Sequence, residues 1–223
     1  MMTFMRVAAF AIGLIAMSGT AIADPADQPQ VTIATSMGDI SVVLDRTHAP
    51  QSVDNFLRYV NEGHYDGTLI YRVVPGFVIQ AGSFDSAAHT RPTHDPIPLE
   101  ANNGLSNVRG TLAMAREDDP NSATAEFFIN LSDNTRLDHH ADDTGNTTGY
   151  AVFGHVVSGM DVVDKIASVP LGDGGPMPGA WPQSPVTIQK VSIIGAAPAA
   201  PASIVQPPAE LSPTAPASAS PPG

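Results

Sequence analysis

Cysteine is missing from the 223-residue sequence, which excludes a disulfide framework, a cysteine-ligated zinc site and a cysteine nucleophile. Positive charge is scarce too, because 10 Lys and Arg stand against 22 Asp and Glu, for a formal net charge of −12. Charged residues make up only 14 % of the chain, against about 25 % in an average soluble domain. An acidic chain without a basic run repels phosphate, so we expect no nucleic-acid partner.

Several catalytic signatures are missing as well. The sequence has no G-x-S-x-G, no Walker loop, no H-E-x-x-H and no glycine-rich dinucleotide turn. Its one dense group of metal-ligating residue types is segment 138–143, where two adjacent His stand among Asp residues. Adjacent His side chains rarely converge on one ion, and a Gly/Asn/Thr stretch follows, so we predict a solvated acidic loop there. We therefore expect neither a metal nor a cofactor.

The N-terminus has the three-part pattern of a cleaved secretory signal. Arg6 is the only charge in the first 23 residues, an apolar run of 11 residues (7–17) follows, and a small-residue segment ends in Ala-Ile-Ala at Ala23. The run is too short for a bilayer span, which needs about 20 residues. We predict a signal peptide over residues 1–23, export to the periplasm or the extracellular space, and no membrane span in the mature form.

The C-terminus is of low complexity. Residues 196–223 hold eight Pro and nine Ala among 28 residues, with Glu210 as the one charge. Proline removes backbone donors and alanine has little surface to bury, so we predict a disordered Ala/Pro-rich tail. Residues 24–195 remain for one domain, long enough to bury about 70 % of its unfolded surface.

The start of this domain predicts a β-hairpin and a helix. Two alternating runs, residues 31–35 and 40–44, surround a Gly-containing turn, which is typical of a hairpin. Apolar residues at i, i+3, i+4 and i+7 then indicate a helix, and they are Val53, Phe56, Leu57 and Val60. Ser52 is placed to cap the start of this helix and Gly63 to end it.

The rest of the domain is dominated by strand patterns. Short apolar runs separated by turn residues occur at 69–74, 77–80, 111–115, 127–131, 151–157 and 186–194. A second helix is predicted over residues 160–169, where Pro170 ends it. The strands do not alternate with helices, which argues against a doubly wound parallel sheet. We expect a mainly β fold, a closed eight-stranded antiparallel barrel capped by two α-helices, because closure removes exposed strand edges.

One Arg stands inside an otherwise apolar strand pattern. A guanidinium among Val and Ile side chains is costly unless it has a partner or a task, and Arg72 is in that position. An edge strand that leaves Arg72 in water is the plain alternative. The neighbourhood favours a task, since Gln80 supplies an amide and Phe77 and Val78 supply apolar surface at a Pro-Gly bend. An apolar pocket with a few polar groups suits binding with electrostatic catalysis.

Taken together, these segments resemble the cyclophilin-type peptidyl-prolyl cis-trans isomerases, and most of all their exported bacterial branch. The segments that carry the resemblance are residues 71–80, 100–105, 109–116, 126–130, 149–154 and 159–163, and they span nearly all of residues 30–194. The resemblance implies the same eight-stranded barrel with two helices. It also implies rotation of X–Pro bonds without a cofactor, proline-containing unfolded or flexible polypeptides as partners, and a monomer.

The resemblance implies a role for eleven residues. Arg72 matches the catalytic Arg, and the substrate-binding residues are Phe77, Val78, Gln80, Met114, Ala115, Arg116, Glu126, Phe128, Leu137 and Tyr150. Within that set, the wall of the proline pocket corresponds to Phe77, Phe128 and Leu137. Gln80 matches the amide that contacts the substrate backbone, and residues 115–116 match the strand along the bound peptide.

Three positions depart from the common family pattern. Glu126 stands where many members have Gln, and a carboxylate cannot donate as an amide does, although it could pair with Arg72. Tyr71 stands where many members have His, and we expect it to change rate and preference rather than abolish activity. Arg136 stands where cyclosporin-sensitive members have Trp, so we expect weak cyclosporin binding.

Two functions remain open from the sequence. The first is an active exported isomerase that assists folding, with Arg72 hydrogen-bonding the proline nitrogen in an apolar pocket. The second is a non-catalytic or weakly catalytic proline-peptide-binding module, or chaperone, on the same barrel, which Glu126 and Tyr71 keep open. An unrelated carbohydrate-binding domain would need exposed aromatic platforms, and 6 % aromatic residues with one Trp leave few candidates.

Overall fold

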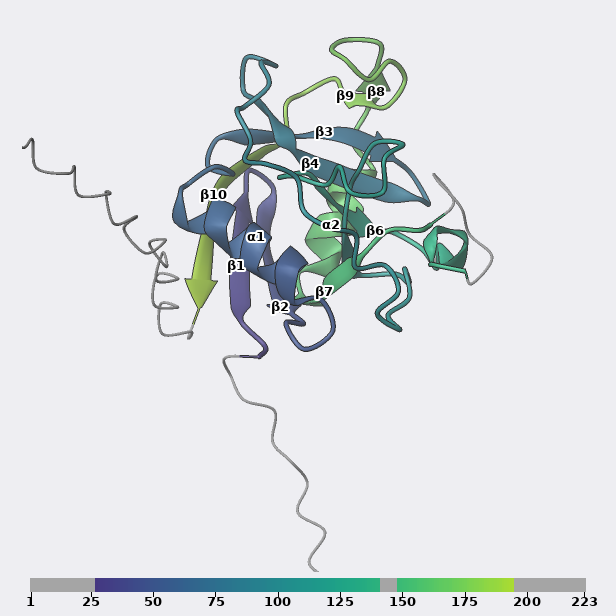
Figure 1. Ribbon diagram of the computed structural model, residues 1–223. Helices are drawn as coiled ribbons and strands as arrows, with labels where there is room; N and C mark the ends of the chain where they lie inside the picture. Colours follow the sequence, from purple (N-terminus) through teal and green to yellow (C-terminus); the bar gives the residue numbers. More distant parts are fainter. Residues whose placement is uncertain (1–26, 141–147, 195–223) are drawn as a thin grey trace, which may run out of the picture.

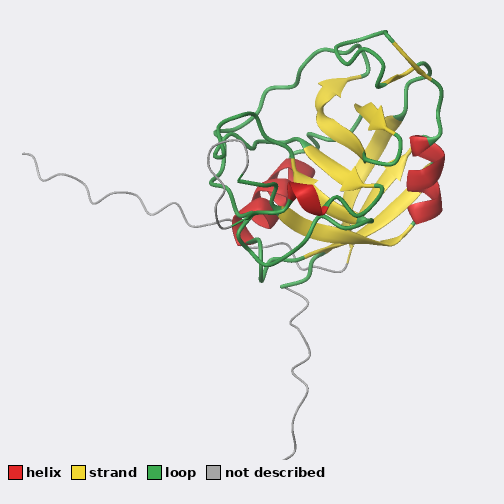
Figure 2. Cartoon of the chain, turned by 90° about the vertical axis from the view of Figure 1, so that its right-hand side faces the viewer, coloured by secondary structure: helices red, strands yellow, loops and turns green. Residues whose placement is uncertain are grey.

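The computed structural model describes residues 27–140 and 148–194. The predicted signal peptide and tail lie outside the described residues, as do residues 141–143 of the predicted acidic loop. Eight strands form the closed antiparallel barrel that the sequence predicts, and their order is β1-β10-β3-β4-β6-β5-β7-β2 (Figure 1). The two α-helices lie on opposite sides of the strands (Figure 2). Among the described residues, no helix is long and apolar enough to cross a membrane.

The barrel begins with the predicted hairpin. β1 (Gln30–Thr35) pairs with β2 (Gly38–Leu44), and Thr35 lies opposite Gly38 at the turn. Because side chains of a strand alternate between faces, every second residue of the hairpin points into the barrel. The buried set is Val31, Ile33, Ile40, Val42 and Leu44.

The first helix begins three residues earlier than predicted. α1 (Pro50–Asn61) has Ala49 as its N-cap, so Ser52 is not the cap. The reason is Pro50, whose fixed φ suits the first helical position and whose missing N–H removes one unsatisfied donor. Capping is supplied from elsewhere in the chain, because the Glu100 carboxylate accepts hydrogen bonds from Ser52 N and Oγ, both at 2.7 Å. Gly63, at φ +69°, follows the helix end as predicted.

The other strands of the barrel fall on the predicted runs. They are β3 (Thr68–Val74), β4 (Val78–Asp85), β5 (Thr111–Met114), β6 (Phe127–Asn130), β7 (Val152–Ser158) and β10 (Thr187–Ile194). The second predicted helix is α2 (Met160–Ala167), two residues shorter than expected. Two small elements were not predicted: the short 3-10 helix η1 (Thr135–Leu137), and the two-stranded sheet of β8 (Leu171–Gly172) and β9 (Trp181–Pro182).

Strand alternation divides the apolar residues into two clusters. The larger cluster fills the barrel and contains Ile79, Met114 and Phe127. A smaller one lies on the other face of β4, β5 and β6, and its buried members are Val78, Ala113, Ala115, Phe128 and Val152. Partly buried Phe77, Leu105, Leu137 and Tyr150 pack against it. This second cluster forms an apolar floor outside the barrel, where the predicted site residues gather.

Candidate active site

A cavity of about 360 Å³ lies on this floor and contains nine of the eleven predicted site residues. Its lining is Arg72, Phe77, Val78, Gln80, Ala115, Arg116, Phe128, Leu137, Tyr150 and Met177. These residues come from β3, β4, β6 and η1, from the β3–β4 turn, from the segments after β5 and before β7, and from the connection between β8 and β9. Residues that lie up to about a hundred positions apart in the chain therefore form one pocket.

Two predicted residues lie elsewhere, and one lining residue was not predicted. Met114 points into the barrel core, because it alternates with Ala113 and Ala115, which face the pocket floor. Glu126 does not line the cavity and reaches it through Gln80. Met177 comes from the connection between β8 and β9, and no spacing in the sequence marks it.

Arg72 stands at the polar edge of this pocket. It lies on β3 directly opposite Gln80 of β4, and its Nη1 donates to Gln80 Oε1 at 3.0 Å. Its guanidinium carbon is 5.9 Å from the centre of the Phe77 ring. The side chain is half-buried and lines the cavity. Gln80 therefore hydrogen-bonds one part of the guanidinium while another part faces the cavity. This is the partner that an Arg in an apolar strand requires.

Gln80 connects Arg72 to two groups behind the pocket. Its Nε2 donates to the Tyr71 hydroxyl at 2.6 Å and to Glu126 Oε2 at 2.9 Å. The pairing of Arg72 with Glu126 that the sequence suggested is replaced by this relay, with Gln80 between the two charges. Because a carboxylate only accepts hydrogen bonds, Glu126 fixes the Gln80 amide with its NH₂ turned away from Arg72 and its oxygen toward it.

Burial changes the acid–base properties of this relay. It raises the pKa of Glu126 above the ordinary value of 4.5, although hydrogen bonds from Tyr71 and Gln80 act in the opposite direction. Burial, and next the charge of Glu126, raise the pKa of the Tyr71 hydroxyl far above its ordinary value. Tyr71 is 1 % exposed, so it is a fixed neutral hydroxyl behind the site.

Aromatic and aliphatic side chains form the walls. Phe128 lies on the floor at 4 % exposure and meets Tyr150 edge to face, with ring centres 5.5 Å apart. Phe77 and Leu137 close the other side. An apolar slot of this size can take a ring of the size of proline and exclude water from the bond next to it.

A buried asparagine network, which was not predicted from the sequence, holds these walls. Asn107 is fully buried, and its Nδ2 donates to the backbone carbonyls of Leu137 and Tyr150, both at 3.2 Å. Asn134 Nδ2 donates to the Phe77 carbonyl at 2.9 Å and to Asn130 Oδ1 at 2.8 Å. Each of these amides fixes backbone that carries a pocket residue. A signal existed in the sequence, because asparagines recur in otherwise apolar segments.

The predicted acidic loop differs from expectation at its start. Asp138 is half-buried and accepts hydrogen bonds from Ser106 Oγ at 2.5 Å and Asn107 N at 2.7 Å. Its carboxylate is therefore used to hold the chain next to the pocket. Over residues 27–140 and 148–194, no group of three or more His, Cys, Asp or Glu could hold a metal ion.

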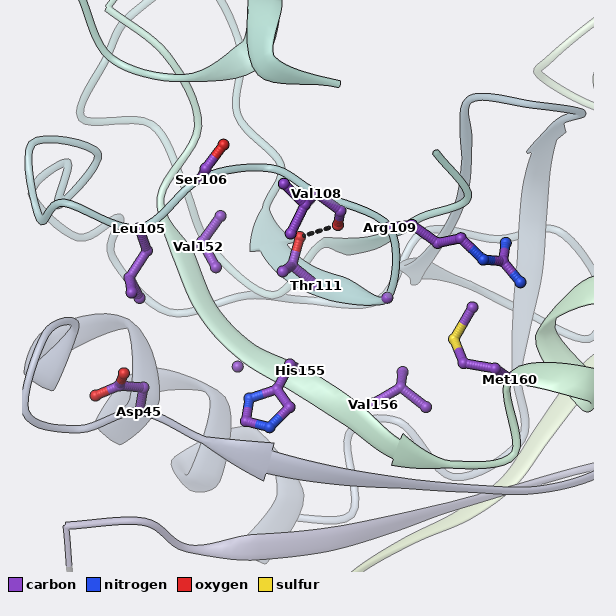
Figure 3. A pocket seen from close by; sticks show the side chains of 12 residues that line it. Asp45, Leu105, Ser106, Val108, Arg109, Thr111, Val152, His155, Val156 and Met160 are labelled. Atoms are coloured by element: carbon purple, nitrogen blue, oxygen red, sulfur yellow. Dashed lines mark hydrogen bonds between the residues drawn. The ribbon is translucent and has the colours of Figure 1, made fainter. Parts of the chain in front are cut away.

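A larger cavity of about 580 Å³ lies beside β7. Figure 3 shows Asp45 at one end of it and Arg109 with Met160 at the other. Two of its charged lining groups are paired with neighbours: Arg109 forms two hydrogen bonds of 2.9 Å with Asp164, and Asp45 Oδ2 lies 2.8 Å from His48 Nδ1. In the smaller cavity, by contrast, a guanidinium and an amide meet an apolar slot.

Comparisons with known proteins agree with this architecture. The family model "Cyclophilin type peptidyl-prolyl cis-trans isomerase/CLD" matches residues 30–193. Peptidyl-prolyl cis-trans isomerase A of Dickeya dadantii is 48 % identical over 164 residues, covering 74 % of this chain and 84 % of the relative. Peptidyl-prolyl cis-trans isomerase B of Escherichia coli is 47 % identical over 163 residues, covering 73 % of this chain and 98 % of the relative.

Solved structures show the same fold. A cyclophilin-type isomerase of Cryptosporidium parvum, crystallised in the presence of the dipeptide Ala-Pro, has a TM-score of 0.63 at 23 % identity and covers 75 % of this chain and 99 % of its own. A cyclophilin from Hirschia baltica has a TM-score of 0.61 at 21 % identity, with coverage of 78 % and 77 %.

The barrel, its outer apolar pocket and these matches define a β-barrel isomerase. The chain belongs to the cyclophilin-type peptidyl-prolyl cis-trans isomerase family, and it is an enzyme of that class.

Proposed function

We propose that the pocket beside Arg72 rotates X–Pro bonds in proline-containing unfolded or flexible polypeptides. The observation that carries this proposal is the half-buried guanidinium of Arg72, held by Gln80 at 3.0 Å on the rim of an apolar slot. The reaction makes and breaks no covalent bond, so it needs neither a nucleophile nor a metal.

The chemistry follows from amide resonance. That resonance opposes rotation with a barrier of about 18–20 kcal/mol, and uncatalysed exchange takes tens to hundreds of seconds. In the twisted transition state the proline nitrogen regains its lone pair and becomes a hydrogen-bond acceptor. A donor fixed beside that nitrogen stabilises the twisted form more than either planar form, which is the condition for catalysis. Arg72 supplies such a donor, because its guanidinium is always charged and rigid.

The other pocket residues bind the substrate on one side of the X–Pro bond, so that the other side is free to rotate. Phe77, Phe128 and Leu137 enclose the proline ring, and water is kept from competing for Arg72. Gln80 and the chain at residues 115–116 hold the peptide backbone on one side of the rotating bond. Val78 forms part of the floor and Tyr150 part of the edge.

Exchange kinetics of an Ala-Pro peptide test this proposal. We expect Arg72→Ala to lower kcat/KM by about 100-fold, the loss typical of removing one preorganised transition-state donor. Arg58→Ala is the matched control, because Arg58 is exposed and lies 5.5 Å over a different ring, that of Tyr59. Equal exchange rates in wild type and Arg72→Ala would contradict the proposal.

One observation supports the weakly catalytic binding module as a second candidate. Both N–H groups of the Gln80 amide are directed at Tyr71 and Glu126, so Gln80 has to give up a hydrogen bond before it donates to a substrate carbonyl. A binding module would show peptide affinity in the micromolar to millimolar range while kcat stays close to the uncatalysed rate. Binding titration beside the exchange assay separates the two candidates.

We also propose an exported, monomeric isomerase whose residues 1–23 are removed and whose residues 24–195 form the active domain. Slow proline steps limit folding, and an exported chain folds outside the cytoplasm. N-terminal sequencing of protein recovered from the periplasm is expected to begin at Asp24, and sedimentation at micromolar concentration is expected to give a monomer mass. An intact N-terminus in the cytoplasmic fraction would contradict export.

A further inference from the structure

Positive charge is concentrated at the rim of the proline pocket. The whole chain has 10 Lys and Arg and a net charge of −12, yet Arg72 and Arg116 both line this one cavity. A third guanidinium, that of Arg136, lies 4.6 Å from the centre of the Phe77 ring, which is itself part of the wall. The pocket is thus a basic site on an acidic protein.

Three basic side chains on other parts of the surface are paired with carboxylates. These pairs are Arg46 with Asp54 at 2.8 Å, Arg109 with Asp164 at 2.9 Å and Lys165 with Asp161 at 3.0 Å. The charges of these three pairs are neutralised locally. At the pocket, the guanidinium groups of Arg72, Arg116 and Arg136 all lie near aromatic rings. Arg116, for example, lies 4.8 Å over the Tyr150 ring.

Arg136 is the rim residue best placed to meet a bound peptide. It is exposed on η1, next to the pocket residue Leu137. Within the part of the chain that the structure describes, its guanidinium forms no ion pair and no hydrogen bond, only the contact with Phe77. A guanidinium that lies over a ring keeps its N–H donors at its edge, in the fork that matches a carboxylate.

Among the described residues, the carboxylates of Glu126 and Asp138 are directed at groups other than Arg136. Glu126 faces Gln80 behind the site, and Asp138 is engaged with Ser106 and Asn107. Glu117 is exposed next to Arg116, so the negative potential it adds lies on the Arg116 side. On the Phe77 side, Arg136 therefore adds an exposed positive charge to that of the half-buried Arg72.

We infer that Arg136 is a specificity-determining residue that favours proline segments with a carboxylate directly before or after the proline. This inference rests on the proposed function and names the substrate class of the same pocket. Exposed ion pairs are modest, so we expect a preference of about two- to fivefold in kcat/KM for Glu over its neutral counterpart Gln. The preference decreases with salt, because the screening length falls to about 3 Å at 1 M.

Two series of peptides test the inference. In the first the residue before proline is Glu, Gln or Lys, and in the second the residue after proline varies in the same way. Each peptide is assayed for cis–trans exchange at 20 mM and at 1 M NaCl, with wild type and with Arg136→Gln, Arg136→Lys and Arg58→Gln. The Glu-to-Gln ratio of kcat/KM is the readout, and the thermal unfolding midpoint of each variant shows that it is folded.

We expect a Glu-to-Gln ratio above two in at least one series at low salt, with the Lys peptide below the Gln peptide. Arg136→Gln brings that ratio to about one, Arg136→Lys keeps part of it, and Arg58→Gln leaves it unchanged. A ratio of one for wild type in both series overturns the inference, and so does a ratio that survives in Arg136→Gln. An equal loss on all peptides also overturns it, because that would show a general packing role. If wild type turns over none of the peptides, the proposed function fails and this inference with it.

Discussion

Replacing Glu126 by Gln is expected to make the enzyme faster. In the native relay, Gln80 Nε2 donates to Glu126 Oε2 at 2.9 Å and must release a donor to contact a substrate. A hydrogen bond to a charged group contributes about 1.5–3 kcal/mol and a neutral one about 0.5–1.5 kcal/mol. Because these two contributions differ by about 1 kcal/mol, the Gln80 amide leaves its partner at position 126 more easily in Glu126→Gln. This difference corresponds to an increase of about fivefold in kcat/KM.

The assay is cis–trans exchange of an Ala-Pro peptide, with Glu117→Gln as the matched control. Glu117 interacts with Glu126 through charge alone, so its removal changes the local potential without changing the hydrogen bond to Gln80. An unchanged rate in Glu126→Gln would refute the reasoning, as would an equal rise in Glu117→Gln.

The same substitution has a pH signature. Since burial raises the pKa of Glu126 above 4.5, the folded state binds more protons than the unfolded state between 4.5 and that raised value. The contribution of Glu126 to the free energy of unfolding therefore falls as the pH rises through this window, and it stays low above it. In Glu126→Gln this contribution is absent, so the variant gains stability relative to wild type as the pH rises. A difference in stability that is constant with pH would contradict the burial of this carboxylate.

Three further predictions concern stability, each measured as a thermal midpoint, where 1 kcal/mol shifts the midpoint by about 2–4 °C in a domain of this size. Asn107→Ala leaves buried carbonyls unpaired and costs about 3 kcal/mol. The control Asn121→Ala removes one exposed hydrogen bond and changes the midpoint little. Equal shifts in the two variants would refute the claim that the buried asparagine network stabilises the pocket walls. Glu100→Gln weakens the capping of α1 and costs about 1–2 kcal/mol, and an unchanged midpoint would show that capping contributes nothing. Burial lowers the pKa of His64 below 6.5, so stability falls as the pH drops below 6.5, and His64→Gln is expected to reduce that slope.

The barrel was predictable because its elements follow local patterns. Alternation in residues 31–35 and 40–44 places one face in the core, and the helical stripe from Val53 to Val60 does the same for α1. The start of α1 was not predictable from its own residues, because the group that satisfies its N-terminal donors is Glu100, 48 residues from Ser52. A cap supplied by a distant carboxylate leaves no pattern in the local sequence.

The pocket was predictable to the extent that its residues belong to ordered motifs. Nine of the predicted residues line one cavity, as expected. Met114 was predicted to lie there with its neighbours, but strand alternation directs its side chain into the barrel core. Met177 and Asn107 could not be found in this way. Met177 comes from a connection whose path depends on β8 pairing with β9, and the role of Asn107 depends on carbonyls that only tertiary folding brings to it.

The most direct test of the account separates binding from rotation in Arg72→Ala. Exchange NMR on an Ala-Pro peptide at saturating concentration reports the rotation rate on the enzyme, and a titration reports the dissociation constant. The account predicts a rotation rate lower by about 100-fold, with a dissociation constant within about threefold of wild type, because the apolar walls that hold the ring remain. A rotation rate on the enzyme that matches wild type, with only the affinity reduced, would contradict the claim that Arg72 acts on the twisted bond.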